Sequence, residues 1–337
     1  MNYELRTNKG FTLIELVVAI ALLGMVLGFS GVIFKTSIEA YRTAGANSEI
    51  MQKLRSITDQ LNSDFKGLQK DAPLLIWFQQ DVNVAEPSRY DQIMFFANGD
   101  FQTVRYPVPV SGNVARVYYG QATVNSILPW AMTGEYKRDR TLARRQHILT
   151  SDPVLVNFPV NNMGNFEPLV FTNTNNDYFE YDKFSLSQWK VVSSNSTFND
   201  TIIITCFDNC PEINIQGVTG LHMLLSQGVG SFSIQWAYGP PVIDKYQWWP
   251  SVDPDGDGVI IDSDFEMMNM DEFGIFFKMP GGVSSAPNWY GPEGAKIQTG
   301  WTFAGFYPKA LKFTFTLYDS KGIIKNGRTF THIVYLD

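Results

Sequence analysis

Apolar and polar residues follow successive patterns along this chain, and each pattern predicts a different structure. Residues 11–34 carry a single charge, at Glu15. From Ile38 to Leu68, apolar side chains recur mostly at steps of three and four residues. Beyond residue 90, apolar and polar residues alternate in short runs. A spacing near 3.6 predicts a helix and alternation predicts strands, so we expect one long helix followed by a β-rich body.

The apolar stretch is long enough to cross a membrane. As a helix, its 24 residues would rise about 36 Å, against a hydrocarbon core of about 30 Å. Arg6 and Lys9 precede the stretch, and positive charge before a membrane helix predicts a cytoplasmic N-terminus. A secretory signal has a shorter apolar region and a small-residue cleavage site after it. We therefore expect a single-pass anchor with the body outside the cytoplasm.

Glu15 distinguishes this stretch from an ordinary anchor, because a carboxylate inside a membrane usually needs a partner. The residues around it, KGFTLIE at positions 9–15, resemble the class III signal of type IV pilins and type II secretion pseudopilins. The resemblance implies that prepilin peptidase cuts between Gly10 and Phe11 and methylates the new Phe11 amine. It also implies that Glu15 pairs with the N-terminus of a neighbouring subunit during filament assembly. A plain anchor helix is the alternative.

The resemblance implies a bacterial inner-membrane protein with an α+β fold and a periplasmic C-terminal domain. The expected parts are a leader over 1–10, a transmembrane and amphipathic helix over 11–70, and a mainly antiparallel, β-rich domain over 71–337. Pro73 predicts the end of the helix, because the residue before a proline avoids helical angles. Segments near 150–200 and 240–300 are rich in Asn, Ser, Pro and Trp and are expected to be insertions.

Short alternating segments predict the strands of the body, with turns at Asn and Gly between them. The predicted strands are 91–97, 101–110, 113–122, 201–207, 229–238, 311–317 and 328–336. The order of DQIMFFANGDF, VARVYYG, TLARRQHIL, VGSFSIQW and YPKALKFTFTLYDSKG resembles the minor pseudopilin J family of type II secretion. That resemblance implies a subunit near the pseudopilus tip, with the major pseudopilin and minor pseudopilins of the H, I and K types as partners. The large pseudopilin K typically lacks the glutamate at the position of Glu15.

Residues 252–265 (VDPDGDGVIIDSDF) fit the spacing of a calcium-binding loop. Calcium takes six to eight oxygen ligands, and closely spaced carboxylates repel one another unless a cation lies between them. Gly258 would allow the sharp turn of such a loop. An acidic surface turn is the alternative, since Asp and Gly favour turns. The expected ligands are Asp253, Asp255, Asp257, the backbone carbonyl of Val259, and Asp264.

The chain has two cysteines, Cys206 and Cys210. In an oxidising compartment they could form a short disulfide, provided that the chain turns between them and brings the Cα atoms within about 7 Å. Two free cysteines are the alternative. Zinc binding is disfavoured, because none of the three histidines has the spacing of a zinc ligand.

Charge and motifs narrow the functional classes. The net charge of −7 disfavours nucleic acid as a partner, since phosphate contacts need clustered positive charge. One basic cluster, within residues 137–145, is expected to be a solvated strand edge or loop. No serine-hydrolase, zinc-protease or phosphate-loop motif occurs, which favours a structural protein over an enzyme. Two alternatives stay open: a type IV minor pilin for adhesion, motility or DNA uptake, and a membrane-tethered periplasmic enzyme or glycan-binding module.

Overall fold

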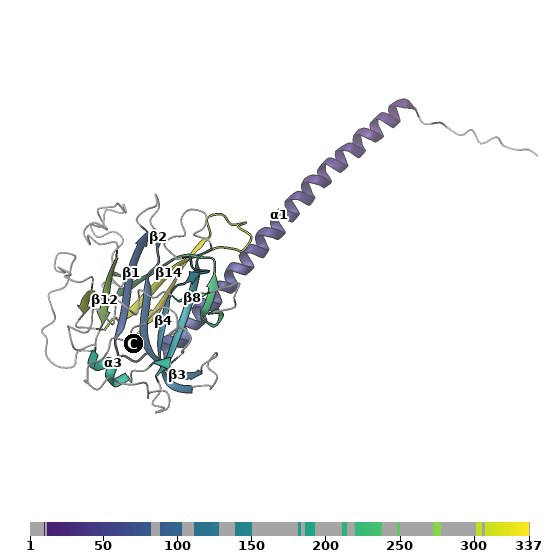
Figure 1. The fold of residues 1–337 in the computed structure, drawn as a ribbon. Helices are drawn as coiled ribbons and strands as arrows, with labels where there is room; N and C mark the ends of the chain where they lie inside the picture. Colours follow the sequence, from purple (N-terminus) through teal and green to yellow (C-terminus); the bar gives the residue numbers. More distant parts are fainter. Residues whose placement is uncertain are drawn as a thin grey trace, which may run out of the picture.

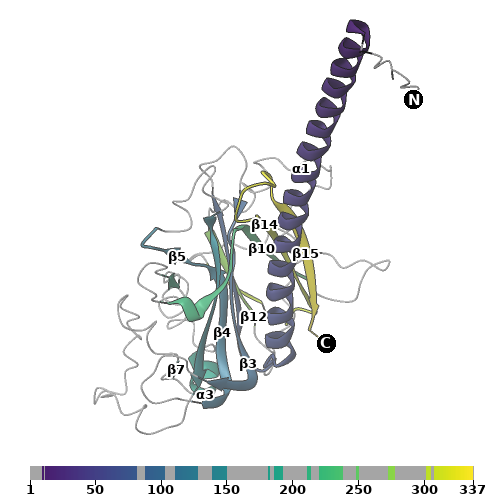
Figure 2. The ribbon, with the colours of Figure 1, turned by 90° about the vertical axis from the view of Figure 1, so that its right-hand side faces the viewer.

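The computed structural model combines a long helix with a β-rich domain (Figure 1). The N-terminal half of the helix projects away from the domain, whereas its C-terminal half lies against the sheets (Figure 2). This confirms the predicted α+β class, with a long helix packed on a mainly antiparallel domain. The structure describes residues 10, 12–81, 88–102, 111–127, 139–149, 181–182, 186–192, 211–213, 220–237, 248–249, 272–277, 301–304 and 307–336.

Helix α1 (Leu13–Lys66) has 54 residues and is therefore about 81 Å long. It ends before the predicted boundary at 70, because the backbone after it turns against a strand of the main sheet. The Asn98 N–H donates to the carbonyl oxygen of Gly67 at 2.6 Å. A Cβ at Gly67 would lie only 2.0 Å from the Asn98 carbonyl oxygen, so this approach requires glycine.

The main sheet has nine strands, and its central order is β13-β12-β1-β3-β4-β6-β7. Its pairs are antiparallel except β12 with β13 and β6 with β7. Two short strands lie off this path, β2 beside β1 and β9 beside β6. The strands are β1 (Leu74–Asp81), β2 (Ser88–Arg89), β3 (Gln92–Gln102), β4 (Ser111–Gln121), β6 (Thr141–Leu149), β7 (Tyr181–Asp182), β9 (Leu224–Gln227), β12 (Glu272–Phe277) and β13 (Trp301–Ala304).

A second sheet has four antiparallel strands in the order β11-β10-β14-β15. Its alternation is the predicted one, since Phe313 and Phe315 are fully buried while Thr314 between them is partly exposed. The strands are β10 (Val229–Ala237), β11 (Trp248–Trp249), β14 (Ala310–Leu317) and β15 (Arg328–Tyr335). The remaining elements are β5 (Thr123–Val124), α3 (Leu186–Val192), β8 (Glu212–Ile213) and the 3₁₀ turn η3 (Leu221–Met223).

One hydrophobic core joins α1 to both sheets. The apolar stripe of the helix supplies Ile57, Leu61 and Phe65 to it. The Phe65 ring stacks on Phe95 of β3 at 4.2 Å between centroids and lies 5.6 Å from Phe313 of β14. Burying such a side chain contributes about 1.5–3 kcal/mol. The helix therefore bridges two sheets that would otherwise expose apolar faces to water.

The structure adds strands that the alternation pattern did not indicate. β1 follows Pro73 and is buried on both faces, so its apolar run has no alternation to detect. It pairs with β12, from Leu74 opposite Phe277 to Gln79 opposite Glu272. The segment near 240–300 thus contributes a strand to the main sheet, and the segment near 150–200 contributes β7 and α3. The predicted strand 201–207 and most of 101–110 lie outside the described residues.

Candidate functional site

The N-terminal end of α1 is organised by Thr12 and Glu15. Thr12 has extended backbone angles and caps the helix, and the Glu15 N–H donates to its Oγ1 at 3.4 Å. In return the Glu15 Oε2 accepts from both the N–H and the hydroxyl of Thr12, each at 2.9 Å. This reciprocal capping box satisfies donors that the first turn of a helix leaves unpaired. Among the described residues, no hydrogen bond reaches the Oε1 of Glu15.

The helix surface that follows is apolar and uncovered. The large apolar side chains from Leu13 to Phe34 are 50–82% exposed. Within the part of the chain that the structure describes, α1 holds one stretch long and apolar enough to cross a membrane, and none of that stretch is buried in the protein. An apolar surface of this length is unfavourable in water and fits contact with lipid or with other apolar helices.

The helix first meets the domain near Ala46, where Glu49 and Lys53 hold the turn between β14 and β15. The Glu49 carboxylate accepts from the Ser320 N–H at 2.9 Å and from its hydroxyl at 3.0 Å. Lys53 donates to the Tyr318 carbonyl oxygen at 2.8 Å and pairs with Glu49 at 2.9 Å. Burial raises the pKa of Glu49, but the hydrogen bonds from Lys53 and Ser320 outweigh it and leave the pKa lowered. Polar contacts thus fix the helix where it leaves the domain.

At the other end of α1, Asp64 is buried and held by β6 and β4. The Arg144 Nε donates to its Oδ2 at 2.6 Å, and the Arg144 Nη2 donates to its Oδ1 at 2.8 Å. The Tyr119 hydroxyl donates to the same Oδ2. Burial and then the Asp64 charge raise the pKa of Tyr119 well above its ordinary value, so the hydroxyl stays protonated. This three-residue group joins the helix to the main sheet through polar contacts inside the core.

The prediction that the basic cluster of residues 137–145 is solvated is wrong for those of its residues that the structure describes. Arg140, which directly precedes β6, is fully buried, and Arg145 on β6 is 7% exposed, because β6 lies inside the main sheet. The Arg140 Nη1 donates to the Gly230 carbonyl oxygen at 3.0 Å, and Arg145 lies over the Tyr118 ring at 4.9 Å. The remaining described cation, Arg144, is the one that binds Asp64.

Not all predicted site residues fall within the described structure. Gly10 is exposed just before α1, and Phe11 lies outside the described residues. The calcium ligands Asp253, Asp255, Asp257, Val259 and Asp264 lie outside them too, as do Cys206 and Cys210. Among the residues that are described, no three His, Cys, Asp or Glu side chains come together in a way that could hold a metal.

Comparison with known proteins identifies the N-terminal segment. Residues 5–31 match the family model described as the prokaryotic N-terminal methylation motif. The match spans the junction of Gly10 and Phe11, the capping box with Glu15, and most of the apolar part of α1. No curated protein and no solved structure was found to match the chain. The motif implies processing by prepilin peptidase, and the exposed apolar helix behind it is consistent with anchoring in the inner membrane.

Proposed function

We propose that this chain, a type IV pilin-like protein processed at its N-terminal methylation motif, is a minor pseudopilin of a type II secretion system. In this role it is a structural subunit near the pseudopilus tip and helps to initiate assembly. One observation carries the proposal: the methylation motif precedes a helix whose apolar half is uncovered, while its other half is built into a β-rich domain. Such a chain has a surface for helix packing and a body that projects from the packed helices.

The assembly step follows from charge inside an apolar environment. Cleavage after Gly10 creates a positive amine at Phe11, and a neighbouring subunit carries the same pair of groups. Thr12 holds the Oε2 of Glu15, and in this proposal the Oε1 accepts from a donor of the next subunit. An ammonium and a carboxylate that both lie in lipid are stabilised by pairing. Apolar contact between the helices supplies most of the attraction between subunits, and the pair of Glu15 with the Phe11 amine sets the register of the helices.

The size of the β-rich domain supports the role of a minor subunit. The domain carries a nine-stranded sheet and a four-stranded sheet, to which the segments near 150–200 and 240–300 contribute β7, β11 and β12. The order of the strand segments, which resembles the pseudopilin J family, favours type II secretion over a type IV pilus. On this basis the partners are the major pseudopilin and the H, I and K minor pseudopilins.

Two further properties belong to the proposal. The first is a calcium ion bound by the aspartate loop of residues 253–264, in which alternate carboxylates and one backbone carbonyl would converge. The second is a disulfide between Cys206 and Cys210 in the periplasm, which mass mapping of the unreduced peptide tests directly. Calcium would hold a loop of like charges together, and the disulfide would fix a short turn beside a predicted strand.

Co-assembly of a Glu15→Leu variant tests the proposal. The full chain is expressed with pseudopilins H, I and K and the prepilin peptidase, and the subunits that purify with it are identified. We expect the variant to be processed after Gly10 but to lose its partners, because the Phe11 amine of a neighbour no longer finds a carboxylate. Glu39→Leu is the matched control, since Glu39 is an exposed carboxylate on the same helix beyond the apolar stretch. Normal partner recovery by Glu15→Leu, or failure of the parent chain to recover any of the three pseudopilins, would show the proposal to be wrong.

A further inference from the structure

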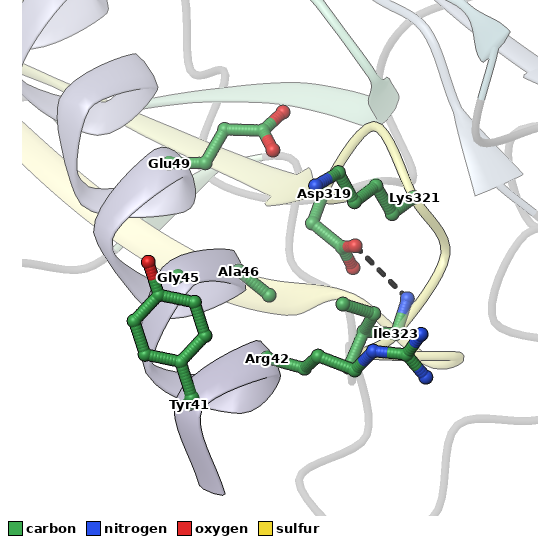
Figure 3. Close-up of a pocket in the computed structure, with 8 residues that line it drawn as sticks. All are labelled: Tyr41, Arg42, Gly45, Ala46, Glu49, Asp319, Lys321 and Ile323. Carbon is green, nitrogen blue, oxygen red and sulfur yellow. Dashed lines mark hydrogen bonds between the residues drawn. The ribbon is translucent and has the colours of Figure 1, made fainter. Parts of the chain in front are cut away.

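A pocket opens where α1 leaves the domain, between the helix and the turn that joins β14 to β15 (Figure 3). Its volume is about 470 Å³. Tyr41 and Arg42 contribute from the helix, and Lys321 contributes from the turn. Figure 2 shows this turn, in yellow, beside α1 at the end of the domain from which the helix projects. The pocket therefore faces the membrane that the apolar half of α1 would cross.

The two carboxylates that line the pocket are already occupied. Glu49 accepts from both donors of Ser320 and pairs with Lys53. Asp319 accepts from the N–H groups of Ile323 and Ile324, each at 2.9 Å. Figure 3 shows the Asp319 carboxylate directed at Ile323, inside the turn. These acids build the walls of the pocket, and their charges are committed to the turn and to Lys53.

The cations of the pocket are exposed and uncommitted within the described structure. Neither Arg42 nor Lys321 forms an ion pair with a described residue. Lys325 and Arg328 lie in the same turn or just after it and are also exposed. The chain as a whole carries a net charge of −7, whereas these four exposed side chains add positive charge at this end. Exposed positive charge at this end favours the approach of an anion there.

The position of Arg42 along α1 indicates which anion its side chain can reach. The apolar stretch ends at Phe34, and Arg42 follows eight residues later, about 12 Å further along the axis. The headgroup layer extends about 5–8 Å beyond the hydrocarbon core on each side of a bilayer. A tilted helix lowers Arg42 toward this layer, and long basic side chains extend their charges into it. Tyr41, which is 82% exposed, is a residue type enriched at that depth.

We infer that Arg42 and Lys321 bind the phosphate of an anionic phospholipid in the periplasmic leaflet of the inner membrane. The Arg42 guanidinium can donate two parallel hydrogen bonds to phosphate oxygens, and Lys321 adds a point charge from the turn. Since Glu49 and Lys53 hold that turn on α1, the lipid fixes the height and orientation of the whole domain on the membrane before assembly. The inference rests on α1 spanning a membrane and does not depend on which filament the subunit joins.

Native mass spectrometry of the delipidated full chain in detergent tests the inference, with phosphatidylglycerol as the probe. We expect the Arg42→Gln/Lys321→Gln variant to bind it at least about tenfold more weakly, a change of about 1.4 kcal/mol. Arg55→Gln/Lys66→Gln is the matched control, because it removes the same charge from exposed sites further along α1. Unchanged Tm values for both variants establish that folding is intact.

Several results would overturn the inference. Equal lipid binding by the two double variants would mean that the pocket cations are not the site. Inorganic phosphate bound as tightly as phosphatidylglycerol, through the same two residues, would make the ligand a free anion. Unchanged lipid binding by Arg42→Gln/Lys321→Gln, together with loss of partner subunits in the co-assembly experiment described above, would make the pocket a protein interface. Carbonate extraction of membranes, done first, separates these results from a failure of α1 to insert.

Discussion

Arg144 of β6 holds Asp64 of α1 through two parallel hydrogen bonds, although 80 residues separate them in the sequence. Asp64 lies on the same face of the helix as Leu61 and Phe65, so the carboxylate enters the core with the apolar stripe. The Tyr119 hydroxyl completes the group from β4. A charge in this position is stabilised only while its partner is present, which makes the orientation of α1 on the sheet specific.

Removing one partner should therefore be costly. We expect Arg144→Met to lower the free energy of unfolding of the full chain by about 3–5 kcal/mol, because Asp64 would stay buried without its cation. Asp64→Asn combined with Arg144→Met should recover part of that loss. Urea unfolding in detergent, followed by the fluorescence of the domain, measures both. The control is Lys190→Met, which breaks the exposed pair with Asp71 and should cost less than about 1 kcal/mol. Similar losses for the two single variants would contradict the buried role of Arg144.

The turn that borders the pocket should weaken in acid. Burial raises the pKa of Asp319, but the hydrogen bonds from the Ile323 and Ile324 amides outweigh it, so the pKa lies below its ordinary value of 3.8. A carboxyl with a lowered pKa stabilises the fold above its unfolded value, and that stability is lost as pH falls through the folded value. We expect Asp319→Asn to be less stable than the parent by about 1 kcal/mol near neutral pH, and equal to it well below pH 3.8.

Thermal unfolding over a pH series measures that difference. Asp59→Asn is the control, because Asp59 is an exposed carboxylate on α1 with no partner among the described residues. A destabilisation of Asp319→Asn that stayed constant down to acid pH would mean that the charge of Asp319 does not support the turn.

The aspartate loop predicts calcium binding by the exported part of the chain. We expect calorimetry on the full chain in detergent to show heat on addition of calcium, with a micromolar to millimolar dissociation constant. The Asp253→Ala/Asp257→Ala variant should lose that heat, because two of the alternating carboxylates are gone. Asp59→Ala, which alters an acid on the helix, should retain it. Absence of heat from the parent chain would refute the calcium site.

The sequence patterns predicted those structural features that depend on residues close together in the chain. The segment 311–317 alternates because one face of β14 is buried, so its strand and inward residues were predictable. The methylation motif is equally local, since KGFTLIE spans seven consecutive residues. The capping box of Thr12 and Glu15 was not predicted, although the spacing T-x-x-E is its signal. The pairing of β1 with β12 joins segments about 200 residues apart, and β1 has no alternation to mark it.

The polar contacts of the core were not predictable for a related reason. Arg144 lies in a run of basic residues, and such a run usually indicates a solvent-exposed surface. Here the strand that carries Arg144 lies inside the main sheet, which the sequence does not show. A signal did exist for Asp64, since it follows Leu61 by three residues and precedes Phe65, both on the buried stripe. The pocket of Arg42 and Lys321 has no such signal, because it depends on a turn returning to the helix from the far end of the chain.

Two glycines of the helix region should respond in opposite directions to the same change. Gly67→Ala places a methyl group 2.0 Å from the Asn98 carbonyl oxygen, and relieving that clash must break the hydrogen bond at 2.6 Å between the two backbones. We expect it to lower the free energy of unfolding by about 1–3 kcal/mol. Gly45→Ala meets no atom within 4 Å and lies inside α1, so it should raise helix stability by about 1 kcal/mol. Urea unfolding of the two variants compares them directly, and a neutral Gly67→Ala would mean that α1 does not end against β3 as described.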